Sequence, residues 1–293
     1  MDRLDIKGCG TALVTPFRNG EVDYDALAAL VDRQVAAGIH FLVPLGTTAE
    51  TPCLSDEEKV EILKVCRAHA PKLTLLVGAG TNSLTGTLRN IDLLAPCGAD
   101  AFLVVAPYYN KPTQNGLYEY FKAVAAHSPK PIVLYNVPGR TGVNISDATT
   151  LRIAADGNVA AIKEASSNYA QISRVIAGAP EGFRIFSGND DETLSLMASG
   201  ASGVISVVSN VVPDKMAALC NAILSNDYPT ARELYRTLLP LCRNCFAESN
   251  PIPVKEALAQ MGFIINELRL PLTRATEATA ELMKKTLKDL NLI

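Results

Sequence analysis

Short apolar runs recur along most of the chain, and we interpret them as buried strands. Each run is too short for a typical helix, and each is apolar throughout instead of alternating between apolar and polar residues. A parallel sheet that is covered on its outer face produces strands of this kind. The eight runs are Thr11–Phe17, Phe41–Thr48, Leu73–Thr81, Ala101–Tyr109, Pro131–Pro138, Val159–Ser166, Phe183–Asp190 and Gly203–Asn210.

The segments between these runs show the spacing of apolar residues that is typical of helices. Tyr24–Ala37 is one such segment, and Gly38 marks its C-terminal end. Ser55 and Glu58 form the capping-box pattern that begins the next helix. Further helices are predicted at Gly116–Ala126, Ser146–Ala155, Ser167–Ala177 and Asp191–Ser199.

Eight strands that alternate with helices predict an α/β fold, a (β/α)8 TIM barrel. A doubly wound sheet is the alternative, because it has the same local pattern but typically about five or six strands. The rest of the chain is predicted to be helical, at Asp214–Ser225, Tyr228–Ala247, Val254–Met261 and Arg274–Leu290. No flexible linker precedes it, so we expect a barrel of residues 1–213 and a C-terminal helical extension of residues 214–293 packed on that barrel.

Composition and charge narrow the classes of function. The 293 residues carry a net charge of −3 and no long run of like charge, which argues against nucleic acid as a partner. No apolar stretch approaches the ~18 residues that cross a bilayer, so we expect no membrane partner. The segment Met1–Asp5 is polar and mixed in charge, without a signal or transit pattern, and it predicts a cytoplasmic protein.

The cysteine pattern does not indicate a disulfide framework. Seven cysteines are scattered along the chain, which suits a reducing compartment. Cys242 and Cys245 have Cys-x-x-Cys spacing, but no second pair or suitably spaced histidines complete a zinc site. We interpret the spacing as chance and expect neither a metal ion nor a cofactor.

Lys163 is the most informative polar residue, because it lies within the apolar run Val159–Ser166. Lysine is rarely buried without a reason, and polar residues at the C-terminal ends of barrel strands face a shared pocket. Apolar surroundings favour the uncharged amine, which is the nucleophilic form. Alternatively, the ammonium group of this lysine reaches solvent or pairs with Glu164.

An imine-forming lysine needs a proton donor and acceptor beside it. The three histidines, His40, His69 and His127, lie away from the C-terminal ends of the predicted strands, which argues against histidine catalysis or a histidine-bound metal. Tyr109 and Tyr135 do lie at such ends, and a phenol can transfer protons. Each tyrosine alone is more often a packed residue, but their joint position opposite a buried lysine favours catalysis.

Two further groups are suited to binding a carboxylate. Thr47 and Thr48 follow Gly46, which lets the backbone approach a small ligand, although ordinary turn chemistry also explains them. Arg140 follows a Pro-Gly turn and offers the planar fork that binds carboxylates. An exposed loop arginine is the alternative interpretation.

Four motifs together resemble the dihydrodipicolinate synthase/N-acetylneuraminate lyase group of pyruvate-dependent class I aldolases. They are Gly46-Thr47-Thr48-x-Glu50, Pro107–Pro112 (PYYNKP), Tyr135–Thr141 (YNVPGRT) and Ile162-Lys163-Glu164. The resemblance runs over essentially the whole barrel. It implies a lyase that needs no cofactor and in which a lysine forms a Schiff base with pyruvate.

The resemblance also implies roles for individual residues. Lys163 would be the imine lysine and Tyr135 the acid and base beside it, with Thr47 and Tyr109 completing a proton relay. In this family the tyrosine that matches Tyr109 acts near the active site of the partner subunit. That arrangement implies a homo-oligomer, usually a dimer within a tetramer.

Substrate binding is implied for four more positions. Thr48 would hold the pyruvate carboxylate, and Gly188 and Ile205 would also contribute to the substrate site. Arg140 matches the synthase branch, whose second substrate, aspartate semialdehyde, has a carboxylate that needs a cation. The resemblance therefore implies condensation of pyruvate with aspartate semialdehyde, the first committed step of lysine and diaminopimelate synthesis.

The chain departs from the family pattern at two places. Ala49 replaces the usual glycine of the Gly-Thr-Thr-Gly-Glu motif, a small-for-small change that we expect to be tolerated. Members that are inhibited by lysine carry a glutamate where this chain has Gly86, and often histidines where it has Asp56 and Lys59. We therefore expect weak or absent inhibition by lysine.

Three other functions remain as alternatives. The first is a sibling aldolase that acts on a keto-sugar acid or a hydroxy-oxo acid. The second is a non-catalytic family member that binds an oxo acid. The third is an unrelated phosphate-binding barrel, but Gly188-Asn189-Asp190-Asp191 is too acidic for a phosphate cup.

Overall fold

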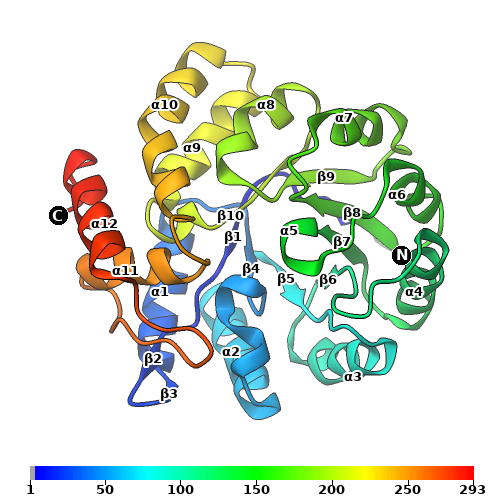
Figure 1. Cartoon of the computed structure of the whole chain (residues 1–293), viewed down its shortest axis with the longest axis horizontal. Helices are drawn as coiled ribbons and strands as arrows, with labels where there is room; N and C mark the ends of the chain where they lie inside the picture. Colours follow the sequence, from blue (N-terminus) through cyan, green and yellow to red (C-terminus); the bar gives the residue numbers. More distant parts are fainter. Residues whose placement is uncertain (1–3) are drawn as a thin grey trace.

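The computed structural model describes residues 4–293, and its centre is a closed barrel of eight parallel strands (Figure 1). The strands are β1 (Gly8–Ala12), β4 (Phe41–Val43), β5 (Thr74–Gly78), β6 (Ala101–Val105), β7 (Ile132–Asn136), β8 (Val159–Glu164), β9 (Arg184–Ser187) and β10 (Gly203–Ser206). Strands β1 and β10 pair and close the barrel, which confirms the predicted fold and excludes the doubly wound sheet. Residues 1–3, part of the segment that predicts a cytoplasmic protein, lie outside the described residues.

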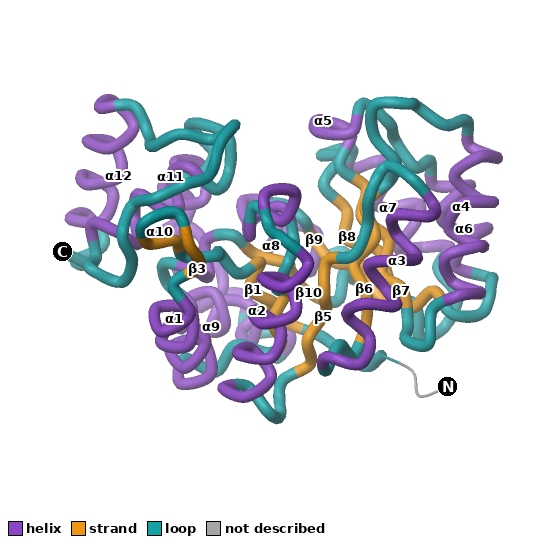
Figure 2. The backbone as a smooth tube through the Cα atoms, turned by 90° about the horizontal axis from the view of Figure 1, so that it is seen from below, coloured by secondary structure: helices purple, strands orange, loops and turns teal. Residues whose placement is uncertain are grey.

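Helices alternate with these strands and cover the outside of the barrel. They are α1 (Tyr24–Ala36), α2 (Asp56–His69), α3 (Leu84–Leu94), α4 (Gln114–His127), α6 (Asp147–Ala154), α7 (Tyr169–Gly178), α8 (Thr193–Ala198) and α9 (Pro213–Leu224), whereas the short helix α5 (Pro138–Thr141) lies beyond the end of β7 (Figure 2). The capping box of α2 is confirmed, because Ser55 and Glu58 each cap the other's backbone N–H. Helix α3 was not predicted, since Gly86 and two threonines weaken its helical pattern.

Strand β1 lies earlier in the chain than predicted. The apolar run suggested Thr11–Phe17, whereas the strand is Gly8–Ala12 and Phe17 belongs to a small hairpin of β2 (Phe17–Arg18) and β3 (Glu21–Val22). Glycines hid the strand, because glycine is a poor strand former by propensity. They are required by close packing: a Cβ on Gly10 would lie 2.1 Å from the ring of Phe41.

Two apolar layers lie on the two faces of the strands. The larger layer packs between the strands and the helices, and the smaller one fills the barrel interior. Phe41 and Phe186 meet inside the barrel edge to face, with ring centroids 5.4 Å apart. Tyr135 and Ile205 belong to the same interior layer, so their side chains point toward the barrel axis.

The C-terminal helices pack on one side of the barrel, as Figures 1 and 2 show. They are α10 (Tyr228–Asn244), α11 (Ile252–Gln260) and α12 (Glu277–Asp289). Helix α9 contacts β1 and α1, so it occupies the place of the eighth barrel helix. The boundary at residues 213 and 214 stays a prediction. Within residues 4–293, no helix is both long enough and apolar enough to cross a membrane.

Candidate active site

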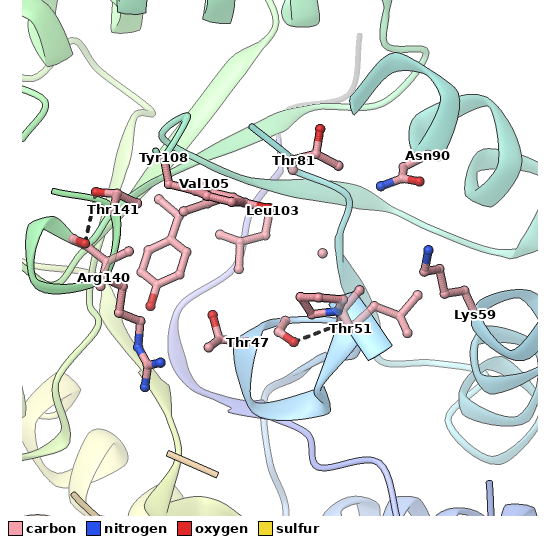
Figure 3. A pocket seen from close by; sticks show the side chains of 17 residues that line it. Thr47, Thr51, Lys59, Thr81, Asn90, Leu103, Val105, Tyr108, Arg140 and Thr141 are labelled. Carbon is pink, nitrogen blue, oxygen red and sulfur yellow. Dashed lines mark hydrogen bonds between the residues drawn. The ribbon is translucent and has the colours of Figure 1, made fainter. Parts of the chain in front are cut away.

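A cavity of about 440 Å³ opens at the C-terminal ends of the strands. Thr47, Tyr135 and Arg140 line it, as the sequence predicts, together with Tyr108 and Lys59. Figure 3 shows Thr47 and Arg140 toward one side of the cavity and Lys59 toward the other. Strand β7 and the segments that follow β4 and β7 therefore bring three of the predicted residues to one cavity.

Lys163 and Tyr135 face each other across two paired strands. They are register partners in β8 and β7, and Lys163 Nζ lies 4.4 Å from the centroid of the Tyr135 ring. Only 6 % of the lysine and 7 % of the tyrosine is exposed. Within residues 4–293, no carboxylate lies within salt-bridge distance of Lys163, and no group accepts a hydrogen bond from it. A buried amine is thus held against the ring of Tyr135, which lines the cavity, whereas Lys163 itself is not one of the lining residues.

Glu164 does not pair with Lys163, because adjacent strand residues point to opposite faces. Its carboxylate accepts hydrogen bonds from Asn136 Nδ2 at 3.0 and 3.1 Å and from the Ser166 backbone N–H at 2.9 Å. Burial raises the pKa of Glu164, and these hydrogen bonds oppose that rise. The interpretation of Lys163 as half of an ion pair with Glu164 was therefore wrong.

The Gly-Thr-Thr motif forms a tight turn after β4. Thr47–Ala49 makes one turn of 3-10 helix, and the hydroxyl of Thr51 donates to the Gly46 carbonyl at 2.9 Å. Thr47 faces the cavity, whereas Thr48 is buried and its hydroxyl accepts a hydrogen bond from Asn250 Nδ2 at 2.9 Å. The two threonines therefore point to different surroundings, which supports different roles.

Arg140 lies in the short helix α5, directly after β7. Its Nη2 donates to the backbone carbonyl of Asn250 at 3.2 Å, and much of its side chain is exposed. The guanidinium is therefore neither free in solvent nor locked in an ion pair. It remains available to a carboxylate at the mouth of the cavity.

Gly188 and Ile205 are both buried in the barrel. A Cβ on Gly188 would meet Lys163 Cε at 3.2 Å and Ala165 Cβ at 2.7 Å, so the glycine leaves room for the lysine. Ile205 is fully buried in the barrel interior. Neither residue is part of the cavity lining, and their contact with substrate stays a prediction.

Tyr109 is the predicted site residue that is neither buried nor part of the cavity lining. Its side chain is 85 % exposed and its φ is 73°, a left-handed conformation that non-glycine residues rarely adopt. The neighbouring Tyr108 lines the cavity instead. A role for Tyr109 in this cavity is therefore not supported by the fold of one chain.

Sequence reasoning missed a second buried lysine. Lys255, in α11, is fully buried, and its Nζ lies 2.6 Å from Glu50 Oε1 and 2.9 Å from the Thr15 carbonyl oxygen. Glu50 also accepts from the Arg269 backbone N–H at 2.9 Å. Lys255 lies in an apolar helical segment, a signal comparable to that of Lys163, but its partners are remote in sequence.

Asn250 and Asp190 were also missed as parts of the site region. Asp190 is buried after β9, and its carboxylate accepts from the backbone N–H groups of Val207 and Val208 at 3.0 and 3.3 Å. Burial raises the pKa of Asp190, and its hydrogen bonds oppose that rise. Nothing in the local sequence marks Asn250 as a neighbour of Thr48.

Within the described part of the chain, the Cys-x-x-Cys pair forms no disulfide and belongs to no group of side chains that could hold a metal ion. Cys242 and Cys245 are buried free thiols at the end of α10, and burial raises the pKa of both. Raised thiol pKa values disfavour the reactive thiolate. Among residues 4–293, no group of three or more histidine, cysteine or acidic side chains could hold a metal ion.

Comparison with known proteins agrees with this architecture. A sequence model of the dihydrodipicolinate synthetase family matches residues 5–290. The 4-hydroxy-tetrahydrodipicolinate synthase of Thermotoga neapolitana is 47 % identical over 292 residues, which are 98 % of this chain and 99 % of that protein.

Solved structures give the same result. The dihydrodipicolinate synthase of Thermotoga maritima superposes with a TM-score of 0.97 at 47 % identity, over 98 % of this chain and 99 % of that one. The chloride-inhibited dihydrodipicolinate synthase of Acinetobacter baumannii, complexed with pyruvate, superposes with a TM-score of 0.96 at 39 % identity, over 99 % and 100 % of the two chains. From its barrel, the lysine and tyrosine at its mouth and these full-length matches, the chain belongs to the dihydrodipicolinate synthetase family.

Proposed function

We propose that this chain is a 4-hydroxy-tetrahydrodipicolinate synthase, which condenses pyruvate with aspartate 4-semialdehyde through a lysine imine. The observation that carries the proposal is the position of Lys163 Nζ, 4.4 Å from the Tyr135 ring and without a carboxylate partner within residues 4–293. The full-length relatives at 47 % identity that bear this name support it. The product would enter lysine and diaminopimelate synthesis, and a cytoplasmic location stays a prediction.

The chemistry begins with attack of the neutral Lys163 amine on the carbonyl carbon of pyruvate. Protonation of the resulting hydroxyl lets it leave as water and forms the imine. Loss of a proton from the methyl group gives an enamine, whose carbon attacks the aldehyde of the second substrate. The amine of that substrate then attacks the imine carbon, closes the ring and releases Lys163.

Tyr135 is the proposed proton carrier for these steps, because it is the phenol beside the lysine. Thr47 lines the same cavity and is the proposed link between Tyr135 and solvent. In the proposed oligomer, Tyr109 of a second copy completes the relay. Its 85 % exposure in the single chain supports this role, since an exposed tyrosine is free to enter a neighbouring cavity.

Each of the two substrates has a carboxylate that must be bound. We propose one buried and one exposed side chain for these two carboxylates. Thr48, buried in the turn after β4, binds the carboxylate of pyruvate close to the imine. Arg140, at the exposed mouth, binds the carboxylate of aspartate semialdehyde. Gly188 and Ile205 complete the wall around the imine.

Free lysine is expected to inhibit the enzyme weakly or not at all. Gly86 leaves no carboxylate for the amines of lysine, and a Cβ there would lie 2.8 Å from Thr81 Oγ1 and 2.9 Å from Ser83 Oγ. Lys59 adds a positive charge to the cavity wall, although Asp56 binds it at 3.2 Å. Initial rates measured across a lysine series test this, and half-inhibition below about one millimolar would contradict it.

Borohydride reduction with and without pyruvate tests the proposed function directly. The reduced imine should add one pyruvate-sized mass to the peptide that contains Lys163. The peptide that contains Lys255 is the internal control and should stay unmodified. An adduct elsewhere, or none, would remove Lys163 as the nucleophile and with it the synthase mechanism.

Substrate comparison separates the synthase from the sibling aldolases. A coupled assay should show turnover of pyruvate with aspartate semialdehyde. Release of pyruvate from keto-sugar acids or hydroxy-oxo acids should be much slower. The reverse preference would support the sibling function, and pyruvate binding without turnover of any of these compounds would support the non-catalytic one.

A further inference from the structure

We propose that Asn250 is a positioning residue that directs the Thr48 hydroxyl toward pyruvate and holds the Arg140 guanidinium over the second substrate. The inference rests on the proposed function, because that proposal assigns carboxylate binding to Thr48 and Arg140. It assigns a part in the reaction to the C-terminal extension, which otherwise contributes no side chain to the chemistry.

The geometry is a bridge between two loops of the barrel. Asn250 lies between α10 and α11 and is 5 % exposed. Its Nδ2 is 2.9 Å from Thr48 Oγ1, after β4, and its backbone oxygen is 3.2 Å from Arg140 Nη2, after β7. Strands β5 and β6 separate β4 from β7 in the barrel, so no barrel strand links these loops directly.

The hydrogen bond to Thr48 determines what that hydroxyl can do. A threonine hydroxyl has one hydrogen to donate and two lone pairs that accept. Because Asn250 Nδ2 donates to Oγ1, it occupies a lone pair and leaves the hydroxyl hydrogen for another acceptor. A carboxylate is an acceptor only, so this orientation suits the carboxylate of pyruvate.

The side-chain amide serves Thr48 alone. Its Oδ1 is buried and has no hydrogen-bond partner within residues 4–293. A purely structural asparagine would be expected to pair both ends of its amide, since buried polar groups are nearly always hydrogen-bonded. Within residues 4–293, the side-chain amide of Asn250 therefore bonds to Thr48 and to no other group.

A second contact fixes where Asn250 lies. The buried pair of Lys255 and Glu50, with an Nζ to Oε1 distance of 2.6 Å, joins α11 to the residue that ends the Gly-Thr-Thr turn. Asn250 and Lys255, both in the extension, thus each form a hydrogen bond to a residue of the same turn. This rigid support is what a positioning residue needs in order to act through Thr48.

The test compares Asn250→Asp and Asn250→Ala with the wild-type enzyme. Aspartate keeps the shape and the backbone oxygen that Arg140 uses, but its carboxylate only accepts, so it captures the Thr48 hydrogen and repels the substrate carboxylate. We expect the KM for pyruvate to rise about tenfold or more in the aspartate variant and less in the alanine variant. The KM for aspartate semialdehyde and kcat should change less.

Asn244→Asp is the matched control. Asn244 Nδ2 donates to Thr286 Oγ1 at 2.7 Å, which is the same type of bond in the same extension but between α10 and α12. Its KM for pyruvate should equal that of the wild-type enzyme. Thermal unfolding of all variants reports whether each one is folded.

A double-mutant cycle with Thr48→Val keeps the test decisive if the aspartate variant does not fold. In the Thr48→Val background, Asn250→Ala should no longer raise the KM for pyruvate. An equal rise in both backgrounds, or an aspartate variant with wild-type KM, would overturn the inference. Failure of the proposed function is distinguishable, because the wild-type enzyme itself would then form no pyruvate adduct at Lys163.

Discussion

Two buried lysines, Lys163 and Lys255, occupy regions that look alike in their apolar burial and differ in their polar contacts. Each Nζ atom lies over an aromatic ring, 4.4 Å from the Tyr135 centroid for Lys163 and 4.2 Å from the Phe17 centroid for Lys255. Lys255 also has a carboxylate at 2.6 Å and a backbone carbonyl at 2.9 Å. Lys163 has neither within residues 4–293.

The difference teaches that burial alone does not identify a catalytic lysine. Lys255 is the more deeply buried of the two, but Glu50 stabilises its charged form. Burial lowers the pKa of Lys255, and the charge of Glu50 opposes that change. A cation held in this way joins elements of the fold, whereas an amine without an anionic partner beside a phenol is available for covalent chemistry.

Replacing Lys163 should give the largest effect, and it should fall on activity. Lys163→Met removes the nucleophile, so turnover should fall at least about a thousandfold. Stability should stay the same or rise, because an apolar side chain replaces a buried amine without an ion-pair partner. Steady-state rates and urea unfolding measure the two quantities, and substantial remaining turnover would show that the imine forms elsewhere.

Replacing Lys255 should instead lower the stability of the protein and leave the chemistry at Lys163 intact. Lys255→Met leaves Glu50 buried without its counter-charge, which should lower the free energy of unfolding by about 3–5 kcal/mol. The folded fraction should still form the pyruvate adduct at Lys163. The control is Glu50→Gln combined with Lys255→Met, which removes both charges and should recover much of the loss. Lack of recovery would mean that the ion pair is not the source of stability.

Crowding Lys163 should give an intermediate effect. Gly188→Ala places a methyl group 2.7 Å from Ala165 Cβ and 3.2 Å from Lys163 Cε, so these neighbours must move and we expect the lysine amine to shift with them. Misplacement of a reacting group on this scale should lower kcat about 10- to 100-fold. Gly116→Ala in α4 is the control for the substitution itself. An unchanged kcat for Gly188→Ala would show that the position of the amine is not set by this contact.

The smallest effect is expected where the extension meets α2. Hydrogen bonds from Arg269 hold the pKa of Glu58 below its ordinary value of 4.5. The folded pKa is lower than the unfolded one, so this contribution to stability is present above about pH 4.5 and is lost as the pH falls through the folded pKa. Glu58→Gln should cost no more than about 1 kcal/mol at neutral pH, since solvent screens the pair.

Urea midpoints of the wild type and of Glu58→Gln, measured from about pH 3 to pH 7, check this expectation. The two curves should converge as the solution becomes acidic. A difference that stays constant over the whole range would mean that Glu58 acts through packing and not through its charge.

Local features of the chain were sufficient for most of the fold. Buried parallel strands are apolar throughout, and helices repeat their apolar residues with a spacing visible over a dozen positions. The eight strands and the capping box of α2 followed from such patterns. Strand β1 was misplaced because its glycines are required by distant segments: Gly8 packs against the ring of His40 and Gly10 against the ring of Phe41.

Part of the site could be predicted in the same way. Lys163 and Tyr135 each follow apolar residues in their strands, so both were expected at the barrel mouth, and the fold places them there as register partners. The fold of one chain leaves Tyr109 exposed, because its proposed role depends on a second copy of the chain.

By itself, the sequence determined the order of the elements and the residue types at the ends of the strands, because these depend on neighbours within a few positions. Only the tertiary structure decided that Lys255 is the lysine with a carboxylate partner, and that Thr48 is the threonine that accepts a hydrogen bond from the C-terminal extension. Glu50 and Lys255 are 205 positions apart, and Thr48 and Asn250 are 202 apart. Residues so far apart in the sequence meet only when the whole chain folds, so a local sequence pattern does not predict these hydrogen bonds.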